Sequence, residues 1–358
     1  MNNHIVVRHP RQLTPQWAQR ILRRSIPHAT VSAVEIESVN PGTTTRTALT
    51  VEHDASAEYP RRWFVKTPAL LLKSRLITAL PGLLQKEIHF YNGLARHSPP
   101  NLPQVLAAQH RFGLGSTLVM ADLRESGQTP GQVGDALTLT QAEAVLRELA
   151  KLHAGFSGKS ALLQAQTWLN PFNAKIELAL GDWLAPPLMR RGLRRAGDLI
   201  PQDLHKPALE YAFNRRRMMR QLTAASNTLV HHDCHPGNLF WTADGPGFLD
   251  WQLVRLGEGV SDVAYFLATA LPSDLRREHE RALLDYYRAA VSAFGGPELP
   301  RGRTFERYRR HVAYAVEAMV LTLAVGDLME EAGNRALIAR AATAAADLQT
   351  FAALGCGD

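Results

Sequence analysis

The stretch LVHHDCHPGNLF, residues 229–240, has five consecutive side chains that are able to bind a metal, from His231 to His235. Zinc is one possible occupant. Structural zinc sites, however, take ligands from spaced pairs, because side chains at adjacent positions point in divergent directions. His231 and His235 are four residues apart, but Pro236 and Gly237 follow at once and argue against a continuing helix. The sequence has no second cluster of metal ligands, so this run of residues favours a function other than zinc binding.

The same stretch fits H-x-D-x-x-x-x-N, with His231, Asp233 and Asn238 at the fixed positions. This is the spacing of a kinase catalytic loop, in which the aspartate orients and deprotonates a hydroxyl and the asparagine holds Mg²⁺. Asp250 ends the apolar run of GFLDW, where a kinase has its second metal-binding carboxylate. Alone it would be an ordinary turn carboxylate, but at this spacing it is a candidate magnesium ligand.

Lys66 ends an apolar strand expected at 61–67, RRWFVKT. A lysine within an apolar strand is costly unless an acid pairs with it. Glu87, on a helix expected at 80–96, is the candidate partner, in the order of the pair that anchors ATP phosphates in kinases. The alternative is that Lys66 caps a strand end and Glu87 is a solvated helix residue.

The segment NPGTTTR, residues 40–46, is the candidate loop over the phosphates, although it has one glycine, Gly42, instead of G-x-G-x-x-G. The hydroxyls of Thr43, Thr44 and Thr45 and the backbone N–H groups could cradle phosphate. A plain hairpin turn accounts for the same residues, so both interpretations stay open.

Around these residues the sequence predicts a five-stranded antiparallel sheet within about the first 120 residues, with one helix after the third strand. The evidence is alternation of apolar and polar residues between turn signals. A helix capped by Thr14, with Pro15 in its first turn, precedes the sheet. The expected strands are 31–39, 45–53, 61–67 and two within 105–123.

The rest is predicted to be mostly helical. Its first helix, 140–156, begins with a T-x-x-E capping box of Thr140 and Glu143. Short strands at 228–231 and 238–242 are expected to flank the catalytic loop as one hairpin. A third short strand is expected at 247–251, and further helices at 206–225, 261–271, 274–294, 303–328 and 330–354.

The predicted fold class is therefore α+β, in the bilobal arrangement of a protein kinase. Residues 1–123 would be the nucleotide-binding lobe, and residues 124–358 the helical lobe with the catalytic loop and acceptor site. With 46% hydrophobic and 20% charged residues, the composition is that of a globular enzyme. The two distant cysteines, the lack of a signal pattern in MNNHIVVRHPRQ and the lack of a membrane-length apolar run predict a cytoplasmic protein.

The formal net charge is +7, and arginine supplies the excess in segments such as NRRRMMRQ and PRGRTFERYRRH. A basic balance can indicate nucleic-acid binding, but the sequence has no recognisable nucleic-acid module. Solvated helix faces are the favoured explanation. We expect neither a nucleic-acid partner nor a membrane span, and the oligomeric state stays open.

Two segments, LVHHDCHPGNLFW and GFLDWQLVRLGEGVSDVAYFL, resemble the aminoglycoside phosphotransferase and choline kinase-like superfamily. EIHFYNGLA, LVMADL and LAKLHAGF look most like its ecdysteroid-kinase-like and related bacterial branch. The similarity covers about residues 30–330. It implies a kinase-like fold and transfer of the γ-phosphate of ATP, with Mg²⁺, to an alcohol group of a small molecule.

The resemblance also implies roles for individual residues. Asp233 would be the catalytic base, and His231, at the start of the same loop, would be the second catalytic residue. Asn238 and Asp250 would hold magnesium, Lys66 would contact the phosphates, and Glu87 would orient Lys66. The remaining implied positions are a hinge at 119–123, where the backbone of Met120, Ala121 and Asp122 faces adenine, and Asp262 as a brace of the catalytic loop.

The chain departs from the family pattern at two positions. The family often has glycine where His232 stands, and Cys234 beside the base is unusual. Simple packing is the favoured explanation for Cys234. Neither change removes a required group, so we expect an active enzyme.

The charge of the segment expected to line the acceptor site bears on the substrate. Residues 171–220 have ten basic and five acidic side chains, a net charge of +5. Coulomb repulsion disfavours a polycation such as an aminoglycoside unless these charges face away. We therefore favour a neutral or anionic alcohol. An antibiotic O-phosphotransferase for aminoglycosides or macrolides and a silent nucleotide-binding scaffold remain alternatives, whereas the short interval after GFLDW argues against a protein kinase.

Overall fold

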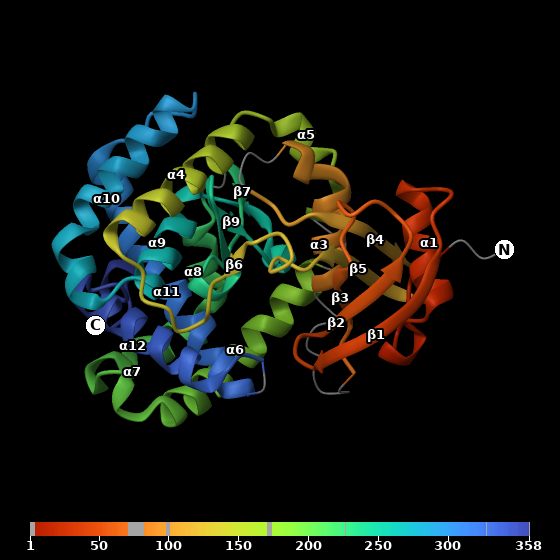
Figure 1. Cartoon of the computed structure of the whole chain (residues 1–358). Helices are drawn as coiled ribbons and strands as arrows, with labels where there is room; N and C mark the ends of the chain where they lie inside the picture. The colour runs from red at the N-terminus through yellow and green to blue at the C-terminus, as the bar shows by residue number, and fades with distance from the viewer. Residues whose placement is uncertain are drawn as a thin grey trace. The chain divides into compact units, whose positions relative to one another are not determined.

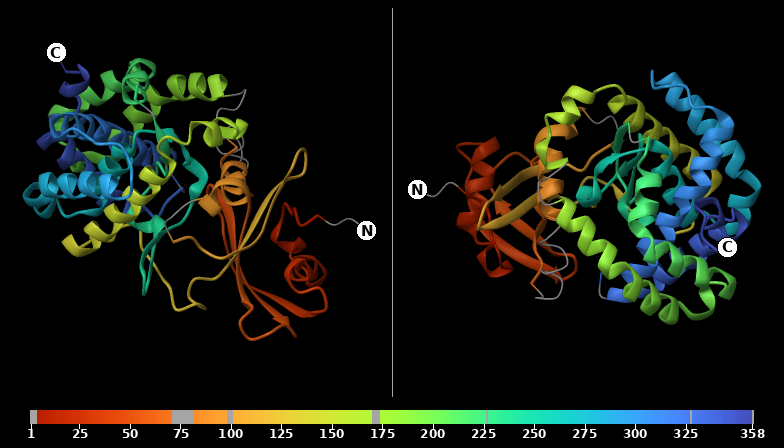
Figure 2. Two further views of the ribbon diagram at one scale, coloured as in Figure 1. Left: turned by 90° about the horizontal axis from the view of Figure 1, so that it is seen from above. Right: turned by 180° about the vertical axis from the view of Figure 1, so that it is seen from behind.

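The computed structural model describes residues 4–70, 82–97, 101–169, 174–225, 227–326 and 328–357. They belong to two compact units, one of Met1–Arg96 with Leu102–Thr129 and the other of His97–Asn101 with Pro130–Asp358. The first unit is built on a β-sheet, and the second is mostly helical (Figures 1 and 2). The predicted fold class is confirmed.

The sheet of the first unit has five antiparallel strands in the order β1-β2-β3-β5-β4. One face is covered by α1 (Pro15–Ser25), which Thr14 caps by accepting a hydrogen bond from the N–H of Trp17. Trp17 packs edge-on against Trp63, and both are fully buried. The strands are β1 (Val31–Asn40), β2 (Thr44–His53), β3 (Arg62–Pro68), β4 (Val105–Arg111) and β5 (Gly115–Ala121).

The helix predicted after the third strand is also confirmed, as α3 (Leu83–His89) followed by a π-helical turn (Phe90–Leu94) and a 3-10 turn (Ala95–His97). Residues 80 and 81 of the predicted helix lie outside the described residues. Leu84 and Ile88 of α3 pack with Leu118 and Met120 of β5. This contact fixes α3 on the sheet, next to the strand that contains Lys66.

The second unit is organised around α9 (Gly259–Ala270), all of whose residues are buried. Four helices surround it (Figure 1). They are α4 (Leu139–Phe156), α10 (Ser273–Ala293), α11 (Arg301–Val325) and α12 (Glu331–Asp347). Among the described residues, no helix is both long and apolar enough to cross a membrane.

Three local predictions in this unit were wrong. The cap of α4 is Thr138 with Gln141, two residues before the expected Thr140 and Glu143, because the T-x-x-Q pair forms the same reciprocal hydrogen bonds. The predicted helix 206–225 is divided at Asn214 into α7 (His205–Phe213) and α8 (Arg215–Leu222). The predicted helix 330–354 ends at Asp347, and a 3-10 turn (Ala352–Leu354) follows.

A further helix was not predicted at all. The segment Ala174–Ala196 forms α6, although Pro186 and Pro187 lie inside it. Proline removes a backbone donor and normally argues against a helix interior. Here tertiary packing against α11 and α7 outweighs that penalty.

The catalytic loop is not the turn of a hairpin. Strand β7 (Thr228–Val230) pairs with β10 (Arg255–Gly257), whereas β8 (Leu239–Thr242) pairs with β9 (Gly245–Phe248). The strands before and after the loop therefore lie in different small sheets. β6 (Thr129–Pro130) completes the sheet of β8 and β9.

Candidate phosphotransfer site

Asp233 is the centre of the candidate site in the second unit. Its Oδ1 accepts a hydrogen bond of 2.6 Å from the hydroxyl of Tyr265, and its Oδ2 accepts one of 3.0 Å from Nδ2 of Asn238. The side chain keeps 23% of its surface exposed, so a reacting group can approach it. The carboxylate is thus held in one orientation with an open edge.

Loss of hydration raises the pKa of Asp233 to about 7, and the nearby charges of Asp250 and Asp262 act in the same direction. The hydrogen bonds from Tyr265 and Asn238 oppose this rise. A pKa near neutrality is what a carboxylate needs to accept a proton at physiological pH.

Asn238 and Asp250 have the oxygen donors that magnesium prefers. Nδ2 of Asn238 donates both to the backbone oxygen and to Oδ2 of Asp233, which turns Oδ1 of Asn238 away from Asp233. Asp250 lies just beyond β9, not at the end of a strand as predicted, with φ of +61°. The N–H of the preceding Leu249 donates to the backbone oxygen of Asn238, which links the two segments.

His231 holds the loop through both ring nitrogens. Nε2 donates to the backbone oxygen of Leu249 over 2.8 Å, and Nδ1 accepts from the N–H of Asp233 over 3.2 Å. This pattern requires the neutral ring protonated on Nε2. His231, which the sequence placed in the catalytic set, is therefore a positioning residue in the structure.

Asp262 braces the loop, as the resemblance implied. The carboxylate is fully buried and accepts hydrogen bonds from the N–H groups of His231 and His232, over 2.7 and 2.8 Å. It lies in the first turn of α9, where the helix dipole favours a negative charge. This contact holds His232 at φ of +70°, the left-handed conformation for which glycine is the usual choice.

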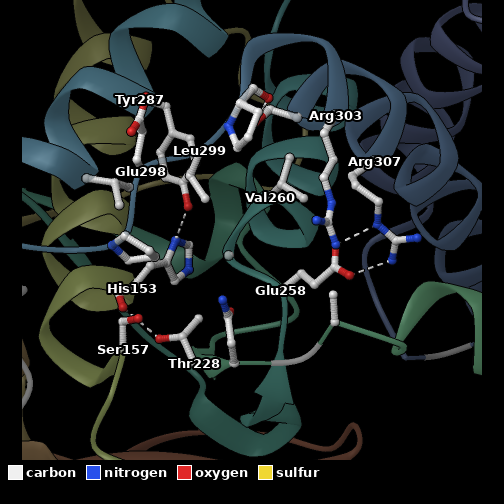
Figure 3. A pocket seen from close by; sticks show the side chains of 17 residues that line it. His153, Ser157, Thr228, Glu258, Val260, Tyr287, Glu298, Leu299, Arg303 and Arg307 are labelled. Atoms are coloured by element: carbon white, nitrogen blue, oxygen red, sulfur yellow. Dashed lines mark hydrogen bonds and ion pairs between the residues drawn. The ribbon is translucent and has the colours of Figure 1, made fainter.

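A second layer supports the brace. Nε2 of His153, on α4, lies 3.2 Å from Asp262. Nδ1 of the same ring is 2.8 Å from the hydroxyl of Tyr287 (Figure 3). A Cβ on Gly259 would lie 2.6 Å from Nδ1 of His153, so only glycine fits there. Sequence reasoning missed His153, Tyr287 and Tyr265. The available signal for His153 and Tyr265 was their place in the LAKLHAGF and DVAYFL segments, and Tyr287 lies in neither.

His235 and Cys234, which were considered as zinc ligands and disfavoured, have other contacts in the structure. His235 caps a 3-10 turn by accepting from the N–H of Gly237, and burial lowers its pKa to about 4. Sγ of Cys234 lies 3.2 Å from the backbone oxygen of Asp262, which agrees with a packing role. Within the described ranges, His, Cys, Asp and Glu do not converge in groups of three that could hold a metal ion.

In the first unit, the predicted pair of Lys66 and Glu87 is confirmed. Nζ of Lys66 lies 2.9 and 3.1 Å from the two carboxylate oxygens of Glu87. Lys66 is 4% exposed and Glu87 is fully buried. Because water is excluded, the attraction between the two charges is screened little, and the pair fixes the position of the lysine.

Removing one partner of this pair should be costly. Glu87→Leu leaves the Lys66 ammonium buried without its carboxylate, and we expect a loss of about 3 kcal/mol in the free energy of unfolding. The double variant Lys66→Met/Glu87→Leu should recover part of that loss, because no charge then stays buried. Urea denaturation of the single and double variants measures both effects. Strictly additive losses would show that the pair is not coupled.

The candidate phosphate loop and hinge occupy the expected elements. Gly42 and Thr43 form the turn between β1 and β2, and Thr43 and Thr44 line a cavity of about 290 Å³ in the same unit. In the hinge, the backbone N–H of Ala121 donates to the backbone oxygen of Gln104, and the backbone N–H of Asp122 donates to the backbone oxygen of Arg62. These two donors are therefore used within the unit and are not directed at adenine. Met120 belongs to the α3 contact.

Comparison with known proteins places this geometry in a family. A scan against family profiles matches residues 50–311 to the phosphotransferase enzyme family. A search of curated proteins finds no match. Similar solved structures include a GDP complex of an aminoglycoside 2'-phosphotransferase variant, with 15% identity over 95% of this chain and 97% of that chain and a TM-score of 0.48.

Two further structures have comparable similarity. The choline kinase of Streptococcus pneumoniae has 12% identity over 93% of this chain and 98% of that chain, with a TM-score of 0.49. The macrolide 2'-phosphotransferase of Brachybacterium faecium has 17% identity over 90% and 97%, with a TM-score of 0.41. The family match spans well over half of the 358 residues and confirms the resemblance drawn from the sequence. The chain belongs to the phosphotransferase enzyme family, and it is a phosphotransferase.

Proposed function

We propose that the protein transfers the γ-phosphate of ATP to a hydroxyl group of a small molecule, with Asp233 as the base. The observation that carries this proposal is the Asp233 carboxylate itself. It is oriented by Tyr265 and Asn238, raised in pKa, partly open and held on a loop braced by Asp262. A base so placed can orient the acceptor hydroxyl and take its proton as the phosphoryl group is transferred.

The other predicted residues take supporting roles. Lys66, held by Glu87, binds the phosphates of ATP, and the loop from Gly42 to Thr44 covers them. Asn238 and Asp250 hold Mg²⁺, which neutralises phosphate charge when bound. Cys234 and Cys356 are both free and buried, which agrees with a reducing, cytoplasmic location.

We favour a neutral or anionic acceptor over an antibiotic polycation. Part of the positive charge expected at the acceptor wall is compensated, since Arg215 pairs with Asp182 and Glu317. The remaining arginines of that segment still outnumber its acids. An aminoglycoside would therefore meet repulsion there.

Release of ADP from ATP in the presence of Mg²⁺ tests the proposal. The acceptors should include aminoglycosides, macrolides, choline, sugars, sterols and hydroxy acids. We expect one chemical class to stimulate release severalfold above the background ATPase. Failure of every class, together with no stabilisation of the protein by Mg-ATP against heat, would instead favour the scaffold.

The metal role of Asp250 can be tested separately. Asp250→Asn removes one negative charge and one strong oxygen ligand, so we expect the Mg²⁺ concentration for half-maximal activity to rise tenfold or more. Asp244→Asn is the matched control, because Asp244 is exposed in the turn between β8 and β9. A magnesium titration of both variants is the measurement. An unchanged magnesium requirement in Asp250→Asn would contradict the assignment.

A further inference from the structure

Arg255, at the start of β10, is a cation without a counter-charge next to the catalytic loop. Its side chain is only partly exposed, and, although its backbone pairs with Val230 of β7, its guanidinium makes no hydrogen bond or ion pair with any residue that the structure describes. Loss of hydration lowers its pKa, the electrostatic interaction with Tyr314 opposes this change, and the positive charge of Arg215 adds to it. Desolvating a cation without a partner is costly, so such a residue is a candidate for ligand binding.

A small pocket of about 20 Å³ lies against Arg255. Ser261, on α9, also lines it; this residue is 7% exposed and its Oγ has no hydrogen-bond partner among the described residues. The ring of His232 forms another wall, stacked on Tyr314 at a centroid distance of 4.0 Å. A buried donor without a partner costs free energy, and here a donor and a cation face the same space.

The other charged groups around the pocket are already compensated. Glu258 pairs with Arg307, with both carboxylate oxygens within 2.7 Å of guanidinium nitrogens, and lies 3.2 Å from His311 (Figure 3). Arg215 is neutralised by Asp182 and Glu317. The net charge left to face a ligand is therefore that of Arg255, which selects an anion.

The pocket lies beside the loop that contains the proposed base. His232, which lines the pocket, directly precedes Asp233 in the chain. Tyr314 also lines the pocket, and its ring lies 5.7 Å from that of Tyr265, which donates to Asp233. An acceptor bound along this wall would have its anionic group at Arg255 and its hydroxyl toward Asp233.

We propose that Arg255 and Ser261 bind a carboxylate of the acceptor, so that the substrate of this phosphotransferase is a hydroxy acid. This inference rests on the proposed function. A carboxylate accepts two parallel hydrogen bonds from a guanidinium and a third from a hydroxyl. It also suits the small volume better than a phosphate, which has more oxygens to accommodate.

Binding of a carboxylate alone is the first test, with acetate and formate as probes and isothermal titration as the measurement. We expect saturable binding to the wild-type protein and to Asp233→Asn. Arg255→Gln should lose it, Arg255→Lys should retain part, and Ser261→Ala should weaken it severalfold. Arg216→Gln is the matched control, because Arg216 is an exposed arginine of α8. Absence of binding to the wild type, or equal binding to Arg255→Gln, would overturn the inference.

Kinetics with matched acceptors is the second test. Each hydroxy acid is paired with its primary amide, which keeps the shape and removes the charge. We expect the wild type to have at least a tenfold lower KM for the acid, and Arg255→Gln to lose this preference while its KM for ATP is unchanged. Equal effects of Arg255→Gln on acid and amide would count against the inference.

The two tests separate the inference from the proposed function. If other alcohols are phosphorylated and hydroxy acids are not, the proposed function stands and the carboxylate site is wrong. If no alcohol is phosphorylated, the proposed function fails, and the acetate titration alone decides whether Arg255 is an anion site. Circular dichroism of Arg255→Gln and Arg255→Lys shows whether a loss reflects misfolding.

Discussion

Asp233→Asn is expected to lower phosphotransfer by about a thousandfold or more, because the amide cannot accept the proton of the acceptor hydroxyl. The variant should still fold. Asparagine has nearly the shape of aspartate, and its oxygen can still accept from Tyr265. Steady-state ADP release at saturating Mg-ATP is the measurement, and Asp244→Asn, in an exposed turn, is the control.

The same variant has a second expected effect, on stability. Burial raises the pKa of Asp233 to about 7 from its ordinary value of 3.8. Protonation of Asp233 therefore stabilises the folded state. This contribution to the free energy of unfolding is fully present below about pH 4 and is lost as the pH rises through 7. In magnesium-free buffer, Asp233→Asn should gain stability relative to wild type across this interval. A variant that keeps full phosphotransfer would remove Asp233 from the mechanism.

Asp262→Ala is expected to damage both stability and catalysis. It leaves the buried N–H groups of His231 and His232 and the ring of His153 without their acceptor. We expect a loss of about 3 kcal/mol or more in the free energy of unfolding. The His232 backbone, held at positive φ by this contact, should relax and displace Asp233.

Urea denaturation and kcat of Asp262→Ala provide the check. Asp274→Ala is the matched control, because its side chain is 97% exposed and forms a surface ion pair with Arg277. The stability and kcat of Asp262→Asn should lie between those of Asp262→Ala and Asp274→Ala, since an amide oxygen can accept one of the two N–H groups. Wild-type stability and kcat in Asp262→Ala would show that the loop does not depend on this brace.

Candidate residues that are recognisable by their charge or by their spacing in the chain could be predicted from the sequence. Asp233, Asn238 and Asp250 are separated by fixed numbers of residues, and Lys66 lies in an apolar strand that demands an acid. The alternation of apolar and polar residues between turn signals also predicted the five-stranded sheet. These features are local, so they can be recognised without the tertiary structure.

What the sequence could not provide depends on contacts between distant segments. Tyr265 meets Asp233 only because α9 packs behind the loop, and His153 meets Asp262 from α4. The same holds for α6, where packing outweighs two prolines. Arg255 was one of many arginines in the sequence, and only the structure shows that its side chain has no partner within the described ranges.

Transfer of the γ-phosphate to an acceptor is tested most directly by following the phosphate itself. ATP labelled with ³²P in the γ position is incubated with Mg²⁺, the enzyme and each acceptor, and the label is traced after separation of small molecules from protein. We expect label on the hydroxyl of a small-molecule acceptor with the wild type and its loss with Asp233→Asn. Label on a small molecule at an equal rate with Asp233→Asn, or label only on protein or free phosphate, would contradict it.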